Sequence, residues 1–209
     1  MSGSERGRFI TFEGIDGCGK STQVDLLAQR LQNQGISVLC VREPGGTEAS
    51  EAIRNILLHR RDLLLTGRTE ALLMCAARAQ LTANKILPAL AAGTWVISDR
   101  YSDSTLAYQG AGRGLEVDWL VELNRFATQD TDPDLTFYLD LSPDTARKRQ
   151  QREQDKIEAE GLAFQHKVRA QYRKLQERFP HRFLLLDGEL GVQELHQRIL
   201  NHLNKRGWF

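Results

Sequence analysis

The sequence predicts an α/β fold in which a five-stranded parallel sheet has helices on both of its faces. Three observations lead to this prediction. Five short apolar runs are spaced along the 209 residues, amphipathic helical patterns separate them, and most of the runs lack strict alternation of polar and apolar residues. A strand that is covered on both faces carries such a continuous apolar run.

The five expected strands are RFITF (residues 8–12), SVLCV (37–41), TWVIS (94–98), LTFYLDL (135–141) and RFLLL (182–186). Strands that alternate with helices along the chain indicate one layered α/β domain. We find no internal repeat, low-complexity tract or interdomain linker. We therefore expect residues 1–209 to form a single domain.

Helical patterns connect the strands. The first helix presents one apolar stripe at spacings i, i+3, i+4 and i+7, and Gly35 can end it; the stripe consists of Val24, Leu27, Ala28 and Leu31. The last helix has a similar stripe, made by Val192, Leu195, Ile199 and Leu203. Further helical patterns cover approximately residues 47–59, 69–92 and 116–128.

The composition excludes several classes of protein. The chain has 28 Lys and Arg against 27 Asp and Glu, and the net charge of +1 argues against a general nucleic-acid or membrane-surface binder. No apolar run approaches the ~20 residues that span a bilayer, and the polar start MSGSERGRF does not resemble a signal peptide. Three cysteines without CxxC spacing, Cys18, Cys40 and Cys75, favour free thiols in the cytoplasm.

A glycine-rich turn follows the first strand. In FEGIDGCGKST (residues 12–22), Gly14, Gly19, Lys20 and Ser21 match the phosphate-loop pattern G-x-x-x-x-G-K-[ST], with a strand before it and a helix after it. Glycine permits close approach of the backbone to phosphate, and the helix N-terminus supplies free N–H groups. Lys20 can bind the β- and γ-phosphates and Ser21 can ligate Mg²⁺. The expected ATP-binding residues are Gly14, Ile15, Asp16, Gly17, Cys18, Gly19, Lys20, Ser21 and Thr22.

Three further stretches narrow the prediction: REPGGTEASEAIRNILL (42–58), DRYSDSTLAYQGAGRG (99–114) and PDLTFYLDLSP (133–143). The first two follow predicted strands and so lie at the carboxyl edge of the sheet, where doubly wound proteins bind ligands. In order and spacing, the four stretches together resemble the thymidylate kinases, P-loop NTPases that phosphorylate dTMP with ATP and Mg²⁺. The resemblance extends from about residue 9 to near the C-terminus.

The resemblance implies a role for each matching residue at the acceptor phosphate and sugar. Asp16 would lie near the sugar 3′-hydroxyl and the magnesium shell, and Asp99 would reach the metal through water. Arg54 and Arg100 would hold the phosphate of dTMP, for which planar guanidinium groups are well suited. Glu43 would border this acceptor site.

The resemblance also assigns residues to the thymine base. Arg78 would donate a hydrogen bond to a thymine carbonyl, and Thr105 and Gln109 would contact other edges of the base. Tyr108 would occupy the place of a ribose 2′-hydroxyl and favour a deoxy sugar. Where the family has an aromatic residue to stack on thymine, this chain has Met74, four residues before Arg78 on the same helix face. Met74 could pack on the base or belong to the core.

The polar stretch RKRQQREQDKIEAEG, residues 147–161, has one large apolar residue, Ile157. It could be a solvated helix, but the resemblance places a short lid there, at about residues 147–160. Some members of the family have an arginine inside the phosphate loop, directly after the acidic residue, whereas this chain has Gly17 there. The resemblance therefore implies that two lid arginines, Arg149 and Arg152, are catalytic. The other catalytic residues that it implies are Lys20, Asp16 and Arg100.

The predicted reaction is direct transfer of a phosphoryl group from ATP to dTMP, and the resemblance also implies a homodimer. Two alternatives stay open at this point. One is another kinase of a small nucleotide or nucleoside. The other, less favoured, is a P-loop ATPase switch protein, which would need switch loops rather than a second anion site.

Overall fold

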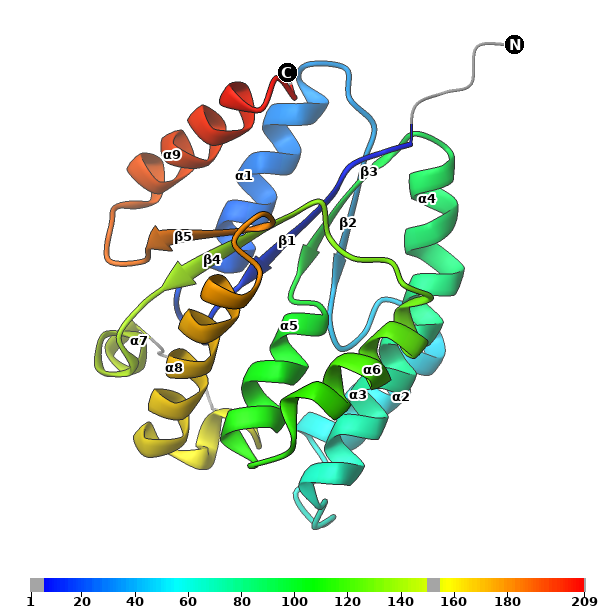
Figure 1. Cartoon of the computed structure of the whole chain (residues 1–209), viewed down its shortest axis with the longest axis vertical. Coiled ribbons are helices and arrows are strands. Elements are labelled where there is room, and N and C mark those ends of the chain that lie inside the picture. The colour runs from blue at the N-terminus through cyan, green and yellow to red at the C-terminus, as the bar shows by residue number, and fades with distance from the viewer. Residues whose placement is uncertain (1–5, 150–154, 209) are drawn as a thin grey trace.

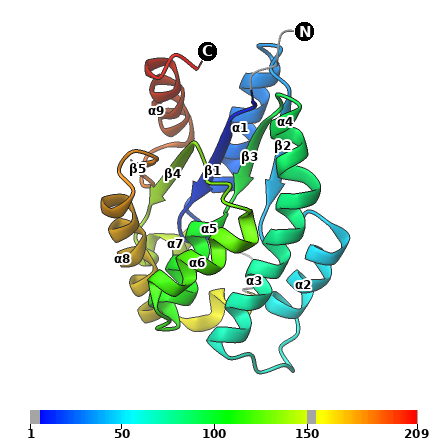
Figure 2. The ribbon, with the colours of Figure 1, turned by 45° about the vertical axis from the view of Figure 1, so that its right-hand side comes forward.

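Five parallel strands form one sheet in the computed structural model, which describes residues 6–149 and 155–208. They are β1 (Phe9–Glu13), β2 (Val38–Arg42), β3 (Trp95–Asp99), β4 (Leu135–Asp140) and β5 (Phe183–Asp187). Their order across the sheet is β2-β3-β1-β4-β5, so β1 lies in the centre (Figure 2). Each strand lies within one residue of its predicted run, and the prediction of a five-stranded parallel sheet is confirmed.

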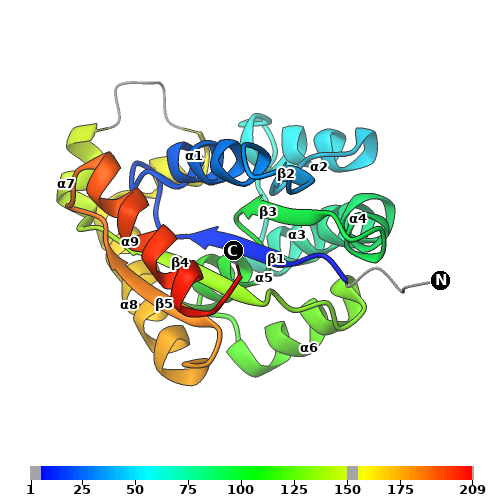
Figure 3. The ribbon, with the colours of Figure 1, turned by 90° about the horizontal axis from the view of Figure 1, so that it is seen from above.

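Helices cover both faces of the sheet, as predicted. Helices α1 (Lys20–Gln32) and α9 (Val192–Lys205) contact each other on one face, while α5 (Ser102–Thr105), α6 (Val117–Thr128) and α8 (Leu162–Arg178) lie on the other (Figure 3). Helices α2 (Glu48–Leu58), α3 (Gly67–Leu81) and α7 (Pro143–Arg149) flank the sheet edge that carries the predicted site (Figure 1). None of the helices in the described ranges is long and apolar enough to cross a membrane.

Alternate residues of β1 belong to two separate parts of the core, because successive side chains of a strand point to opposite faces. Phe9 lies in a cluster with Leu81 and Leu90. Its neighbour Ile10 lies in the larger cluster that contains Leu27 and Leu31 of α1. All of these side chains are at least 98% buried, so β1 is covered on both faces, as its apolar sequence predicted.

The long helical pattern predicted for residues 69–92 is present, but it is interrupted. Helix α3 continues into a π-helical segment, η1 (Thr82–Ile86), and then into α4 (Leu87–Ala91). Pro88 lies near the start of α4 and lacks the N–H that an uninterrupted α-helix would need there. The wider turn just before it accommodates this missing hydrogen bond.

Helix α8 was not identified from the sequence, although its pattern is present there. Its buried residues Phe164, Val168, Tyr172 and Leu175 recur at helical spacing. Most other positions of this helix are polar or charged, which weakens the contrast that identifies an amphipathic helix. Tyr172 of this helix reaches the functional site described below.

The carboxyl ends of β1 and β3 meet at one edge of the sheet, since Phe12 is paired with Asp99. The glycine-rich turn follows β1, and the stretch of residues 99–114 begins at the end of β3. The topology therefore brings these two predicted site segments together, at the edge where doubly wound folds bind ligands.

Candidate active site

The glycine-rich turn between β1 and α1 has a backbone that glycine adopts readily and other residues rarely do. Gly14, Gly17 and Gly19 have φ angles of 138°, 86° and 97°. A Cβ atom on Gly14 would lie 2.6 Å from the carbonyl oxygen of Leu139, so a larger residue would not fit. No side chain caps the N-terminus of α1, and the N–H groups of its first turn are therefore available to an anion.

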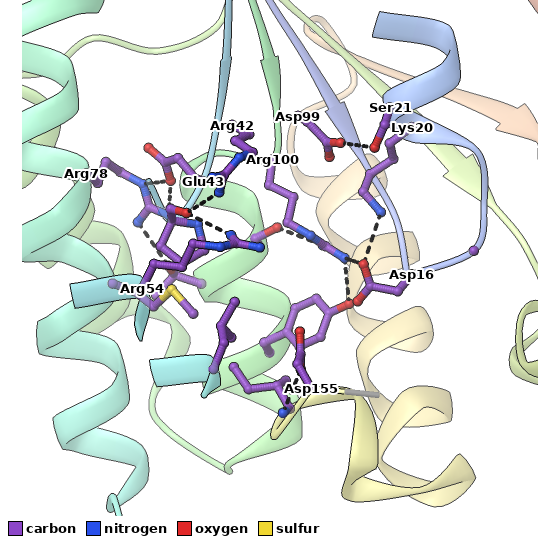
Figure 4. A pocket seen from close by; sticks show the side chains of 18 of the residues that line it. Asp16, Lys20, Ser21, Arg42, Glu43, Arg54, Arg78, Asp99, Arg100 and Asp155 are labelled. Atoms are coloured by element: carbon purple, nitrogen blue, oxygen red, sulfur yellow. Dashed lines mark hydrogen bonds and ion pairs between the residues drawn. The ribbon is translucent and has the colours of Figure 1, made fainter. Parts of the chain in front are cut away.

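Lys20 folds back over the turn that precedes it. Its Nζ donates to the carbonyl oxygens of Gly14 and Ile15 at 3.1 Å and lies 3.8 Å from Asp16 Oδ1. The neighbouring Ser21 Oγ donates to Asp99 Oδ2 at the end of β3 (Figure 4). A buried cation, a hydroxyl and two carboxylates thus surround the turn.

Arg100 lies between this turn and the rest of the site (Figure 4). Its φ angle of 71° is unusual for a residue other than glycine, and such strain concentrates at functional positions. One terminal nitrogen donates to Asp16 Oδ1 at 2.9 Å and to the Tyr108 hydroxyl at 3.1 Å. The other donates to Ser104 Oγ at 3.1 Å. The guanidinium group is therefore held in one orientation.

A buried carboxylate, Glu13, shares the Ser104 hydroxyl with Arg100. The phosphate-loop pattern did not identify Glu13 as functional. Its oxygens accept hydrogen bonds at 2.7 Å from the Tyr101 N–H, the Ser104 hydroxyl and the Tyr172 hydroxyl. Burial, with a further contribution from Asp103, raises the pKa of Glu13 to about 7. An acidic residue at the end of a buried apolar run was the available signal in the sequence.

Arg78 lies at the opposite side of the site and is 99% buried. It forms an ion pair with Glu43 at 2.6 Å and donates to Thr105 Oγ1 at 2.9 Å. It also donates to Asn124 Oδ1 at 2.6 Å and to the carbonyl oxygen of Tyr101 at 3.0 Å. All three guanidinium nitrogens thus have protein partners, and Asn124 is one that the sequence analysis did not single out. Glu43 Oε1, by contrast, is buried without a hydrogen-bond partner among the described residues.

Two further arginines converge on one carbonyl group at the end of β2. Arg54 donates to the carbonyl oxygen of Pro44 at 2.8 Å, and Arg42 donates to the same oxygen at 3.2 Å. Burial and the nearby charge of Arg42 lower the pKa of Arg54. An anion bound here would relieve this repulsion.

One pocket of about 470 Å³ joins these parts of the site. Its size lies within the range of small-molecule sites. Predicted residues that line it are Asp16, Gly17, Gly19, Lys20, Ser21, Thr22, Glu43, Arg54, Met74, Arg78, Asp99, Arg100, Thr105, Tyr108, Gln109 and Arg149. Gly14, Ile15 and Cys18 are buried behind it, and residues that were not predicted complete the wall: Arg42, Pro44, Leu58, Ser104, Asp155 and Ile157.

The predicted base-contacting residues lie together on one wall. Met74 faces the pocket beside Arg78. Gln109 follows Tyr108 in a π-helical segment, η2 (Leu106–Gly112), and its amide nitrogen lies 3.4 Å from Glu70 Oε2. Wide π-helical turns are frequent at functional sites, and this one directs both side chains toward the same wall.

The predicted lid is described in part. Arg149 at the end of α7 lines the pocket, and its guanidinium donates to the carbonyl oxygen of Gly188 at 2.9 Å. Arg152 lies outside the described residues. On the far side of that gap, Ile157 is 93% buried and also lines the pocket. Ile157, the one large apolar residue among residues 147–161, is therefore packed in the core rather than exposed on a solvated helix.

A phosphate-binding turn at one side of a pocket and a cluster of arginines at the other define a class of protein. This is a P-loop kinase of the type that binds a nucleotide donor and a small anionic acceptor in one cavity.

Comparison with known proteins identifies the family. The sequence model for thymidylate kinase matches residues 12–199, and the chain belongs to this family. It is 47% identical over 196 residues to the thymidylate kinase of Caldanaerobacter subterraneus subsp. tengcongensis, covering 93% of this chain and 94% of that one. It is 44% identical over 201 residues to that of Thermoanaerobacter sp., covering 96% and 98%.

A solved structure gives the same result. The crystal structure of thymidylate kinase from Ehrlichia chaffeensis superposes with a TM-score of 0.78 at 34% identity, covering 95% of this chain and 99% of that chain. The resemblance to thymidylate kinases that the sequence showed is therefore confirmed, together with the P-loop NTPase fold.

Proposed function

We propose that this chain transfers the γ-phosphoryl group of ATP to dTMP and so forms ADP and dTDP. One observation carries the proposal: a single pocket holds the phosphate-binding turn with Lys20 at one side, Arg54 and Arg78 at the other, and Arg100 between them. Its relatives are named thymidylate kinases. A switch ATPase would not require this second anion site.

Different residues of the pocket bind the phosphoryl donor and the phosphoryl acceptor. The N–H groups at the start of α1 and the Lys20 ammonium bind the donor phosphates. Arg54 and Arg100 bind the acceptor phosphate, and the hydrogen bond from Arg100 to Asp16 fixes the direction in which its guanidinium points. Phosphoryl transfer depends mainly on alignment and charge stabilisation, so the reaction proceeds in line and without a covalent enzyme intermediate.

The donor site fits Mg²⁺, which binds oxygen ligands and usually keeps several waters. The Ser21 hydroxyl and the Asp99 carboxylate lie side by side at this site. The described residues contain no group of three or more His, Cys, Asp or Glu that could hold a metal ion, so the remaining ligands would be phosphate oxygens and water. Ser21 would bind the metal directly and Asp99 through water, and the metal would neutralise phosphate charge during transfer.

Recognition of the base rests on the wall around Arg78. Its four protein partners hold the guanidinium in a fixed position, so an acceptor oxygen of the base must share or replace one of these hydrogen bonds. Thr105 and Gln109 lie beside it on the pocket wall, and Met74 is placed to pack on the ring. We expect dTMP to be preferred, dUMP to be weaker, and dCMP to be poor because it presents a donor where thymine has O4.

The exposed apolar side chains on two neighbouring helices favour a homodimer. Leu72 of α3 and Trp119 of α6 are about half exposed, and Phe126 of α6 is 86% exposed. Helices α3 and α6 are in contact, so these side chains can form one surface that a second copy would cover. We place the protein in the cytoplasm, since its three cysteines are free thiols.

The substrate is tested by ATP consumption with dTMP, dUMP, dCMP or no acceptor. ATP consumption that depends on dTMP and yields dTDP supports the proposal. Equal kcat/KM for dTMP and dCMP would indicate a different nucleotide kinase, and ATP hydrolysis that no acceptor stimulates would indicate a switch protein.

The donor site is tested by Lys20→Ala, with Lys205→Ala as a control at an exposed position of α9. We expect Lys20→Ala to lose most of its turnover while its circular dichroism spectrum is unchanged, and Lys205→Ala to retain activity. A folded Lys20→Ala variant with near-parental turnover would contradict the assignment of the phosphate-binding turn.

A further inference from the structure

Arg113 lies outside the pocket, at a point where three of its walls meet. It follows the η2 segment, which contributes Tyr108 and Gln109 to the pocket, and its backbone N–H donates to the carbonyl oxygen of Tyr108 at 3.0 Å. Helix α3, which contributes Met74 and Arg78, passes beside it. The segment of residues 155–164 approaches it from the third side.

The side chain of Arg113 contacts each of these parts. Its guanidinium makes a bidentate ion pair with Glu70 of α3, with both N···O distances at 2.9 Å. It also lies 2.6 Å from Glu160 Oε1. The guanidinium carbon is 5.0 Å from the centre of the Phe164 ring at the start of α8.

The two carboxylates have different environments, and this decides what the loss of Arg113 would do. The Glu70 side chain is 4% exposed, whereas that of Glu160 is 34% exposed. Without the arginine, two negative charges would face each other, and Glu160 is the one that can move toward water. The segment that carries Glu160 would then separate from α3.

That segment forms part of the roof of the pocket. Asp155 and Ile157 line the cavity, and the backbone N–H of Lys156 donates to the carbonyl oxygen of Leu58 at 3.3 Å. The Lys156 ammonium also donates to the carbonyl oxygen of Leu63. Glu160 is therefore a further attachment of the same short segment, on the side of the predicted base-contacting residues. Gln109, which contacts Glu70 at 3.4 Å, connects this attachment to the base wall.

We propose that Arg113 is a positioning residue for phosphoryl transfer: through Glu160 it holds the 155–161 segment over the acceptor end of the pocket. The inference rests on the proposed kinase function. Arg113 does not touch the pocket, and it acts through the position of Asp155 and Ile157 and through the orientation of Glu70. A well-placed roof excludes water and completes the site, which affects kcat more than the binding of the acceptor.

The test compares Arg113→Met, Glu160→Gln and the double variant, with Arg125→Met as a control. Arg125 pairs with Glu122 and Asp130 on the surface of α6, and its variant should retain parental kinetics. We expect Arg113→Met to lower kcat about 10- to 100-fold, as for a lost hydrogen bond between charged groups. The KM for dTMP should change less than kcat.

The double variant separates positioning from general structural damage. If repulsion between Glu70 and Glu160 displaces the roof, removing the Glu160 charge should restore kcat severalfold in the Arg113→Met background. A double variant that is as slow as the product of the single effects would overturn the inference. If Arg113→Met does not fold, Glu160→Gln still tests the inference. A parental kcat in Glu160→Gln would overturn the inference.

Hydrogen exchange provides a readout that does not depend on the reaction. Amides of residues 155–161 should exchange faster in Arg113→Met and in Glu160→Gln than in the wild type, while β1 stays protected. Unchanged exchange in this segment would contradict the inference even in an active enzyme. If the wild type failed to phosphorylate dTMP, the proposed function would be wrong, and the exchange result would still decide whether Arg113 holds the segment.

Discussion

Glu13 should make the stability of this protein depend on pH. Its side chain is fully buried between the end of β1, the turn after β3 and helix α8, and its pKa is raised to about 7 from an ordinary value of 4.5. In the unfolded chain this carboxyl loses its proton near pH 4.5, whereas in the folded protein it keeps the proton up to about pH 7. The folded state therefore binds more protons between these two values.

The sign and size of the effect follow from this difference. Below pH 4.5 the carboxyl is protonated in both states and its burial has no ionisation cost. As the pH rises toward 7, the unfolded state gains the benefit of ionisation first, and the free energy of unfolding falls. The two pKa values differ by about 2.5, and at 1.36 kcal/mol for each pKa unit the wild type should lose about 3 kcal/mol through Glu13 alone.

The assay is urea unfolding at a series of pH values between 4.5 and 8 for the wild type and Glu13→Gln. Other groups titrate in both proteins, so the difference between the two free energies of unfolding isolates Glu13. This difference should shift by about 3 kcal/mol in favour of the variant as the pH rises to 7, and then stay level. Glu194→Gln, which removes a carboxylate at an exposed position of α9, is the matched control.

A flat difference profile for Glu13→Gln would refute the reasoning. It would mean that the three hydrogen bonds to this carboxylate and the charge of Arg100 offset its burial completely. Glu13 would then be ionised in the folded protein throughout the neutral range.

Two further predictions concern the lid and the assembly. Alanine at Arg149 or Arg152 should lower kcat by roughly 10³-fold or more if that arginine stabilises the transferring phosphoryl group, and dTMP affinity should change little. Normal kcat in both single variants and in the double variant would exclude such a role. Phe126→Glu should convert a dimer into a 23.7 kDa species in sedimentation experiments, because an unpaired charge cannot be buried in the dimer interface. A wild type that sediments only at 23.7 kDa at micromolar concentration would contradict the dimer.

The sequence by itself determined the sheet and the donor side of the site. The strands are continuous apolar runs, and the phosphate-binding turn is a contiguous stretch whose geometry depends on local backbone freedom at Gly14, Gly17 and Gly19. Resemblance to a family then placed Arg54, Arg78 and Arg100 in order along the chain, and the structure brings all three to one pocket.

The tertiary structure alone decided the partners of these residues. Asn124 bonds to Arg78 across 46 positions of sequence, Tyr172 bonds to Glu13 across 159, and Glu160 meets Arg113 through the packing of α8 against η2. No local pattern identifies such pairs, because a side-chain hydrogen bond or ion pair depends on the distance between elements that the whole fold brings together. The sequence could thus predict which groups a kinase needs. Burial and contacts that exist only in the folded chain raise the pKa of Glu13 and fix the orientations of Arg78 and Arg100.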